Sequence, residues 1–166
     1  MGRTFQVAQI FHNMTVLEYV MIGALSRWGG TSQARTIALE VVEKMGLTNR
    51  AHYPAVGLSL CETKILEIGR ALATQSKLLL LDEPMAGLNP EETYRIGEMI
   101  KAIAKSGITV MVIEHVVQSL LKVADLMIGL DEGRKVAEGT PAEVTSNPYI
   151  IEAYLGTKWK TRYAKG

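Results

Sequence analysis

Two adjacent carboxylates, Asp82 and Glu83, follow a run of four leucines and precede Pro84. The leucine run predicts a strand over residues 77–82 that is buried on both faces. The carboxyl ends of parallel strands form the edge at which open α/β folds bind ligands. At such an edge Asp82 could hold Mg²⁺, directly or through water, and Glu83 could accept a proton from an attacking water. The alternative is a strand that simply ends with two acids facing solvent.

Ser59 and His115 are further candidates for a phosphate site. Ser59 precedes a predicted helix, and the backbone N–H groups at a helix N-terminus suit a phosphate, although a serine there is more commonly only an N-cap. His115 follows the predicted strand 108–113, so it would lie at the same sheet edge as Glu83 if the two strands are parallel. A histidine with a purely structural role is the alternative. Gln6 is uninformative by itself.

The second half of the chain alternates strand and helix patterns, which is typical of a largely parallel sheet with helices on its faces. After the strand at 77–82, Asn89, Pro90 and Glu92 predict a helix start with an N-cap and a capping box. This helix is expected to end at Gly107. The remaining predicted elements are strands at 108–113 and 126–130, a turn at 131–134 with a short returning strand at 135–138, and helices at 117–124, from 140 and from 147 to 155.

The first half of the chain is predicted to be helical. Apolar spacing indicates helices at 16–25, 33–45 and 58–75, with a break at 28–32. The expected organisation is a short segment at 1–13, a helical subdomain at 14–75, an α/β part at 76–157 and a basic tail at 158–166.

Composition excludes several classes of protein. The 166 residues, 48% of them hydrophobic, suffice for one ordinary core, and a net charge of +1 gives no field that would attract nucleic acid. No apolar run reaches the roughly 18 residues that span a bilayer, and no signal peptide is recognisable, so a cytosolic chain is expected. The single cysteine, Cys61, excludes an internal disulfide framework and a cysteine-based zinc site.

Taken in order, the motifs resemble those of the ATP-binding subunits of ABC transporters. The resemblance rests on Gln6 before a helical segment, LSLCE at 58–62, LLLLDEPMAGLNP at 78–90 and IEH at 113–115. RTFQ, MTVLEYV and the final EGTPAEV and IIEAYLG are most similar to the subunits of importers for branched-chain amino acids, or for urea and amides. The fold this implies is α/β: an incomplete P-loop NTPase domain with a mostly parallel sheet and an α-helical subdomain.

The resemblance implies a role for each matching residue. Gln6 would be the Q-loop glutamine, which contacts Mg²⁺ and the attacking water and relays to the membrane subunits. Asp82 would be the Walker B aspartate near Mg²⁺, and Glu83 the catalytic carboxylate that polarises the water. His115 would contact the γ-phosphate of ATP.

The resemblance also implies a dimer, formed with a copy of the chain or with another ATPase subunit. Ser59, Cys61 and Glu62 would belong to the signature motif, which contacts ATP bound to the opposite subunit. Membrane-spanning permease subunits would hold the dimer on the cytoplasmic face of the cell membrane. The D-loop, which would meet its copy across the dimer, comprises Ala86, Gly87, Leu88 and Asn89.

Two features depart from the family pattern. No segment reads G-x-x-x-x-G-K-[ST], so the phosphate-binding Walker A loop that should precede Gln6 does not occur in the sequence. The signature motif has Cys61 where the family has glycine and Thr63 where it usually has glutamine. Because a side chain fills space that glycine leaves open, Cys61 is expected to weaken the contact with the opposite nucleotide.

Two main hypotheses of function follow from the sequence. The first is an ATP-binding and ATP-hydrolysing subunit of an importer for branched-chain amino acids, in a truncated form impaired in nucleotide binding. The second is a non-catalytic module whose helical subdomain docks a membrane subunit or a full-length ATPase. A third is an unrelated α/β binding domain with chance matches. The Walker A lysine discriminates between the first two, and in-frame DNA upstream of Met1 would show whether one is encoded.

Overall fold

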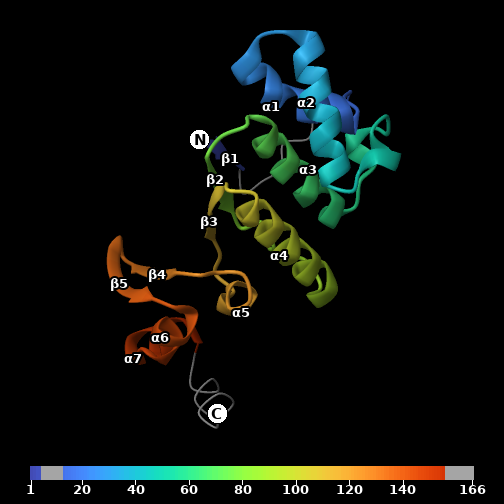
Figure 1. The fold of residues 1–166 in the computed structure, drawn as a ribbon. Helices are drawn as coiled ribbons and strands as arrows, with labels where there is room; N and C mark the ends of the chain where they lie inside the picture. Colours follow the sequence, from blue (N-terminus) through green and yellow to red (C-terminus); the bar gives the residue numbers. More distant parts are fainter. Residues whose placement is uncertain (5–12, 156–166) are drawn as a thin grey trace. The chain divides into compact units, whose positions relative to one another are not determined.

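The computed structural model describes residues 1–4 and 13–155 and divides the chain into two compact units, Met1–Glu114 and His115–Gly166 (Figure 1). Each unit has its own sheet and helices. The predicted basic tail at 158–166 lies outside the described residues, and the predicted four-part organisation of the chain stays a prediction.

A parallel sheet lies in the first unit. Its strands follow the order β1-β2-β3, and Asp82 of the central strand pairs with Ile113 of the third. The parallel arrangement confirms the prediction from the alternating pattern. Leu79 and Leu81 are buried, but Leu78 and Leu80 are only partly buried, so the expectation of burial on both faces is met on one face. The strands are β1 (Gly2–Arg3), β2 (Leu78–Asp82) and β3 (Thr109–Ile113).

Thr4 fastens β1 to the end of β2. Its side chain is buried, with 3% of its surface exposed. The Thr4 N–H donates to the Leu80 carbonyl oxygen at 3.0 Å, and the Thr4 Oγ1 accepts from the Asp82 N–H at 3.0 Å. The hydroxyl therefore satisfies the last backbone donor of β2, at the residue that ends the strand.

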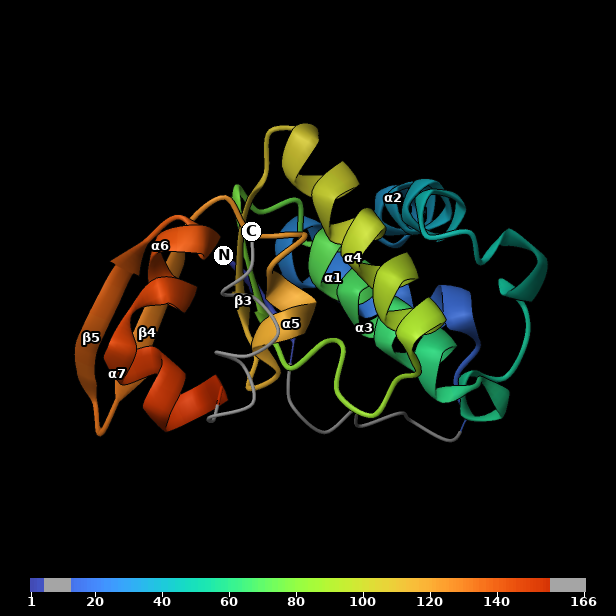
Figure 2. The ribbon, with the colours of Figure 1, turned by 90° about the horizontal axis from the view of Figure 1, so that it is seen from below.

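Three helices of the first unit pack against one another. Thr15 and Glu18 form a capping box at the start of α1, and Gly29, with a φ of 63°, ends that helix in the left-handed conformation. Figures 1 and 2 show the three side by side, with α3 in contact also with β1 and β2. The helices are α1 (Val16–Trp28), α2 (Thr31–Lys44) and α3 (Leu60–Ala73), with short 3-10 turns η1 (Thr48–Arg50) and η2 (Ala55–Gly57) between the last two.

Glycines set how closely these helices approach. A Cβ built on Gly23 of α1 would lie 2.0 Å from the carbonyl oxygen of Arg70 in α3, so only glycine fits at that crossing. A Cβ on Gly69 of α3 would instead lie 3.3 Å from Met45 Cγ, an atom on a flexible side chain. At Gly23 the backbones of α1 and α3 therefore meet directly, with no side chain of α1 between them.

Helix α4 (Pro90–Lys105) follows β2 and contacts β3. Asn89 and Glu92 form the predicted capping box, and Pro90 occupies the first turn. The buried side chains of the helix include Ile96, Ile100 and Ile103, which recur at the spacing of an apolar helix face.

The second unit is built on a β-hairpin. Strands β4 (Met127–Asp131) and β5 (Arg134–Gly139) pair antiparallel, and the two turn residues, Glu132 and Gly133, both have positive φ, as a type I′ turn requires. The predicted strand at 126–130 is therefore found in a separate two-stranded sheet, because the tight turn sends the chain straight back along β4. Within the described residues, no helix combines the length and apolarity needed to cross a membrane.

Short helices cover this hairpin. The core of the unit comprises Val117, Met127, Val144 and Ile150. The helix predicted at 117–124 is shorter than expected: it ends at Leu120, and the Leu120 carbonyl oxygen accepts the N–H groups of both Val123 and Ala124 in the turn that follows. The helical segments are α5 (Val117–Leu120), α6 (Pro141–Ser146), α7 (Pro148–Ile150) and the π-helical turn η3 (Ile151–Leu155).

We expect Gly23→Ala to lower the free energy of unfolding by about 1–3 kcal/mol, because its methyl group must push α1 away from the Arg70 carbonyl. Urea unfolding followed by circular dichroism measures the effect. Gly69→Ala is the matched control, since it also adds a methyl group within these helices but meets only side-chain atoms, the nearest of them Met45 Cγ at 3.3 Å. Equal midpoints for wild type and Gly23→Ala would contradict the close crossing.

We expect Thr4→Val to destabilise the first unit by about 1–3 kcal/mol, because it removes the acceptor of the Asp82 N–H while keeping the shape of the side chain. Thr4→Ser keeps the hydroxyl and should retain most of the stability. Thermal unfolding of both variants tests the bond, and a loss in Thr4→Ser with none in Thr4→Val would show that the methyl group, not the hydroxyl, matters.

Candidate functional site

Asp82 ends β2 and presents a partly exposed carboxylate. Its Oδ2 lies 3.6 Å from Nη2 of Arg3, and 25% of the Asp82 side chain is accessible to solvent. A partly exposed ion pair of this length contributes little to stability, so the carboxylate can exchange Arg3 for another cation. The position agrees with the predicted place of Asp82 at the carboxyl edge of a parallel sheet.

Glu83, the next residue, has an unusual backbone conformation. Its φ is 45°, in the left-handed region that residues other than glycine rarely adopt. Three hydrogen bonds hold it there: the Glu83 N–H donates to Ile113 O at 2.9 Å, Lys64 Nζ donates to Glu83 O at 2.9 Å, and the Ala86 N–H donates to Glu83 O at 3.3 Å. Strained residues of this kind cluster at functional sites, where the surrounding structure stabilises them.

The predicted D-loop residues lie between β2 and α4. A carboxylate oxygen of Glu114 accepts the Met85 N–H at 2.8 Å and fixes the start of this turn. Gly87 has a φ of 78°, and a Cβ built on it would lie 3.2 Å from Leu60 Cδ2 at the start of α3. The turn after Asp82 and Glu83 thus runs next to the segment that carries Ser59.

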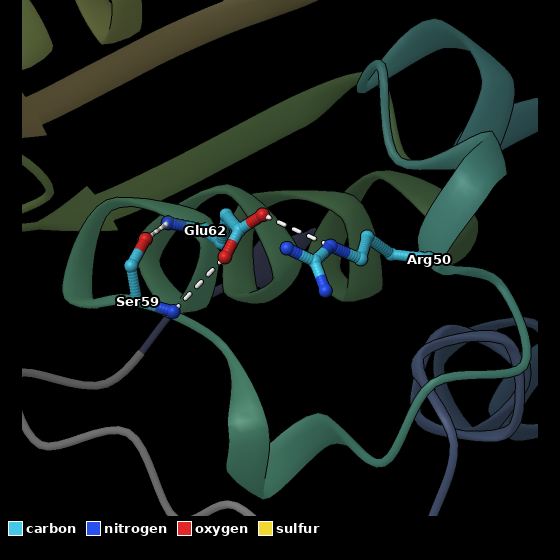
Figure 3. Close-up of polar contacts among 3 residues, drawn as sticks. All are labelled: Arg50, Ser59 and Glu62. Atoms are coloured by element: carbon cyan, nitrogen blue, oxygen red, sulfur yellow. Dashed lines mark hydrogen bonds and ion pairs between the residues drawn. The ribbon is translucent and has the colours of Figure 1, made fainter.

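Ser59 and Glu62 form a capping box at the start of α3 (Figure 3). The Ser59 Oγ accepts the Glu62 N–H at 3.2 Å, and Glu62 Oε2 accepts the Ser59 N–H at 3.0 Å. Glu62 Oε1 lies 3.5 Å from Arg50 Nε, and the Arg50 guanidinium stacks over the Tyr53 ring at 4.7 Å. In this structure the serine therefore acts as the N-cap that the sequence allowed, and Arg50 offsets the charge of the Glu62 carboxylate.

Cys61 is buried, with 4% of its surface exposed, and lies in the first turn of α3. Burial raises the pKa of the thiol, and the nearby Glu92 carboxylate raises it further. The backbone of Cys61 is helical and not left-handed, so replacing the family's glycine here causes no backbone strain. The expected weakening of a nucleotide contact by Cys61 stays a prediction.

For two predicted site residues, a place beside Asp82 and Glu83 stays a prediction. Gln6 lies outside the described residues, and His115 is the first residue of the second unit, two residues beyond the end of β3. Within the first unit the structure brings together Asp82, Glu83, the turn at 86–89 and, through Lys64 and Leu60, the start of α3.

The sequence analysis missed Lys64, Thr4 and Arg50. Lys64 and Thr4 act on residues 19 and 78 positions away, so no local spacing indicates their partners. Lys64 does carry one signal: it stands between Thr63 and Ile65, both of which are buried in α3. A lysine so placed needs an acceptor for its ammonium group.

The described residues contain no group of three or more His, Cys, Asp and Glu side chains arranged for a metal ion. Asp82 supplies one carboxylate at an accessible sheet edge. Mg²⁺ at phosphate sites is commonly held by one or two carboxylates, with the other ligands coming from phosphates and water. The site therefore suits a metal ion that binds together with a nucleotide. It does not suit an ion held by protein side chains alone.

Two family models match the chain. The ABC transporter model matches residues 1–86, and a model described as branched-chain amino acid ATP-binding cassette transporter matches residues 134–159. The first match includes the start of α3, β2, Asp82 and Glu83. The second includes all of β5 and the helical segments that cover the hairpin.

Curated relatives carry matching names. The high-affinity branched-chain amino acid transport ATP-binding protein LivG of Salmonella typhimurium is 34% identical, over 93% of this chain and 67% of the relative. The glutamine transport ATP-binding protein GlnQ of Escherichia coli is also 34% identical, over 89% of this chain and 62% of the relative. The chain thus spans about two thirds of the length of LivG.

Solved structures show the same fold. A nucleotide-free ATP-binding cassette from an ABC transporter superposes with a TM-score of 0.81 at 30% identity, covering 93% of this chain and 68% of that one. The cbiO1 protein of Clostridium perfringens, part of the ABC transporter complex cbiONQ, superposes with a TM-score of 0.79 at 26% identity, covering 98% and 64%. Together with the LivG match, these similarities show that the chain belongs to the family of ABC transporter ATP-binding proteins, with the P-loop NTPase fold.

Proposed function

We propose that this chain forms part of the ATPase that drives an importer for branched-chain amino acids. The single observation that carries the proposal is the end of β2, where Asp82 presents a carboxylate at a parallel sheet edge and Glu83 is held in a strained conformation. The LivG similarity and the match at residues 134–159 support the solute class.

In this proposal the two adjacent acids have separate tasks. Asp82 gives up its partly exposed contact with Arg3 and supplies a carboxylate for Mg²⁺ that arrives with ATP. Bound there, Mg²⁺ neutralises charge on the phosphates. Glu83 accepts a proton from, and orients, the water that attacks the γ-phosphate. Gln6 and His115 are proposed to contact the same water and phosphate.

The proposed active form is a dimer, because the signature motif acts on a nucleotide bound by the opposite subunit. Ser59, Cys61 and Glu62 would face that nucleotide, and the D-loop residues would meet their counterparts. Permease subunits in the cell membrane are the proposed partners and would hold the ATPase at the cytoplasmic face. The G-x-x-x-x-G-K-[ST] motif does not occur in these 166 residues, so hydrolysis is best tested with that segment supplied.

A second candidate function is a non-catalytic module that docks a permease subunit or a complete ATPase. The missing phosphate-binding motif favours it for these 166 residues alone. The capping box also favours it, because the Ser59 hydroxyl and amide are already hydrogen-bonded to Glu62. Two binding titrations of the chain test it, one with Mg-ATP and one with permease subunits. Binding of permease subunits without binding of nucleotide would favour the non-catalytic module.

The test of the first proposal is a cassette in which the N-terminal phosphate-loop segment of LivG precedes residue 1. We expect this cassette to hydrolyse ATP and Glu83→Gln to reduce turnover by about a hundredfold or more, because the amide cannot take the water's proton. Release of phosphate and equilibrium binding of ATP are the two measurements.

Glu98→Gln is the matched control, because it makes the same change on the surface of α4, where Glu98 pairs only with Lys101 among the contacts described. It should leave turnover unchanged, and Glu83→Gln should leave ATP binding unchanged. Unaltered turnover in Glu83→Gln would remove Glu83 from the catalytic role, and a cassette that binds no ATP would remove the proposed ATPase function.

A further inference from the structure

Lys64 makes the contact that connects α3 to the strained residue after β2. Its Nζ donates to the carbonyl oxygen of Glu83 at 2.9 Å in a partly buried setting. A hydrogen bond from an ammonium group is about twice as strong as one between neutral groups, and loses less to solvent when partly buried. Lys64 therefore acts on the backbone of Glu83, at the residue proposed as the catalytic carboxylate.

The Glu83 backbone needs such support. A left-handed φ in a residue with a side chain costs about 1–3 kcal/mol unless the surroundings stabilise it. The N–H of Glu83 is fixed by Ile113 on β3, and the carbonyl by Lys64 on α3, so the two sides of the residue are held by different elements. Since φ sets the direction of the Cα–Cβ bond, these bonds also set where the carboxylate begins.

The same helix carries the predicted signature motif. Ser59 caps α3, and Lys64 follows five residues later on that helix. A helix is rigid over such a distance, so displacement of the Ser59 end moves the Lys64 ammonium relative to Glu83. The contact offers a direct physical link between the segment proposed to touch the opposite nucleotide and the residue proposed to activate water.

We propose that Lys64 is a positioning residue, which holds the Glu83 backbone in its left-handed conformation and so couples the start of α3 to the catalytic carboxylate. The proposal rests on the function proposed above for Glu83. It assigns Lys64 no contact with nucleotide or water. Its effect is expected on the rate of hydrolysis and not on nucleotide affinity.

The first test uses the 166-residue chain and needs no ATP. In Lys64→Met, which keeps an unbranched apolar stem of similar length, the amides of Glu83 and Ala86 should exchange with deuterium about tenfold faster, because each depends on the conformation that Lys64 fixes. Residue-resolved NMR measures these rates. The amide of Met45, bonded to Val41 in α2, should be unaffected, and Lys64→Arg should restore protection.

The second test uses the cassette with the LivG segment. Lys64→Met should lower kcat by about tenfold to a hundredfold, while the Kd for ATP stays within about twofold, because misplacing a catalytic group affects the chemical step. Lys64→Arg should recover most of kcat. Lys101→Met is the matched control, since Lys101 also lies on a helix and pairs with Glu98 at the surface.

The outcomes separate the two proposals. Faster exchange at Glu83 with reduced kcat supports the positioning role, whereas exchange and kcat that both match wild type overturn it. A general loss of stability, seen as faster exchange at Met45 as well, would also overturn it, because Lys64 would then be merely structural. If the wild-type cassette hydrolyses no ATP, the proposed function fails, and the exchange measurement still decides whether Lys64 holds Glu83.

Discussion

The pairing of β2 with β3 is the constraint on which the rest of the first unit depends. It aligns Asp82 with Ile113, the Glu83 N–H still donates to Ile113 O, and the left-handed φ of Glu83 then turns the chain out of the sheet. The left-handed turn at Glu83 then directs residues 86–89 toward the cap of α4. Two acidic residues adjacent in the sequence thus receive different backbone conformations, and this difference allows them different chemical tasks.

Local chemistry made much of the fold predictable. Asn89 with Pro90 and Glu92 define a helix start within four residues, and the structure confirms this capping box as well as the helix predicted from residue 140. A run of leucines and a tight turn likewise depend only on neighbours in the sequence. The candidate carboxylates were predictable for the same reason, since the strand that positions Asp82 precedes it directly.

The interactions that finish the site were not predictable, because they join residues far apart in the chain. Thr4 meets Asp82 across 78 positions, and Lys64 meets Glu83 across 19. Nor does periodicity tell which strands share a sheet: the predicted turn and returning strand give the pairing of Met127–Asp131 with Arg134–Gly139, but not its separation from the parallel sheet. The left-handed φ of Glu83 has no sequence signal, since a glycine would ordinarily mark such a position.

The start of α3 shows how a departure from the family pattern is accommodated. Cys61 stands where the resemblance implies a glycine, and its thiol is buried, on a helical backbone that accepts it without strain. Glu62, in contrast, places a carboxylate on the Ser59 amide, at the end of a helix that favours negative charge. An anionic ligand at this end must therefore compete with the protein's own carboxylate for the same donor. Arg50 reduces the repulsion, because its guanidinium, stacked on Tyr53, already faces Glu62. Arg50 thus offsets the negative charge that the capping box places at this helix end, and no motif in the sequence identifies Arg50 for this role.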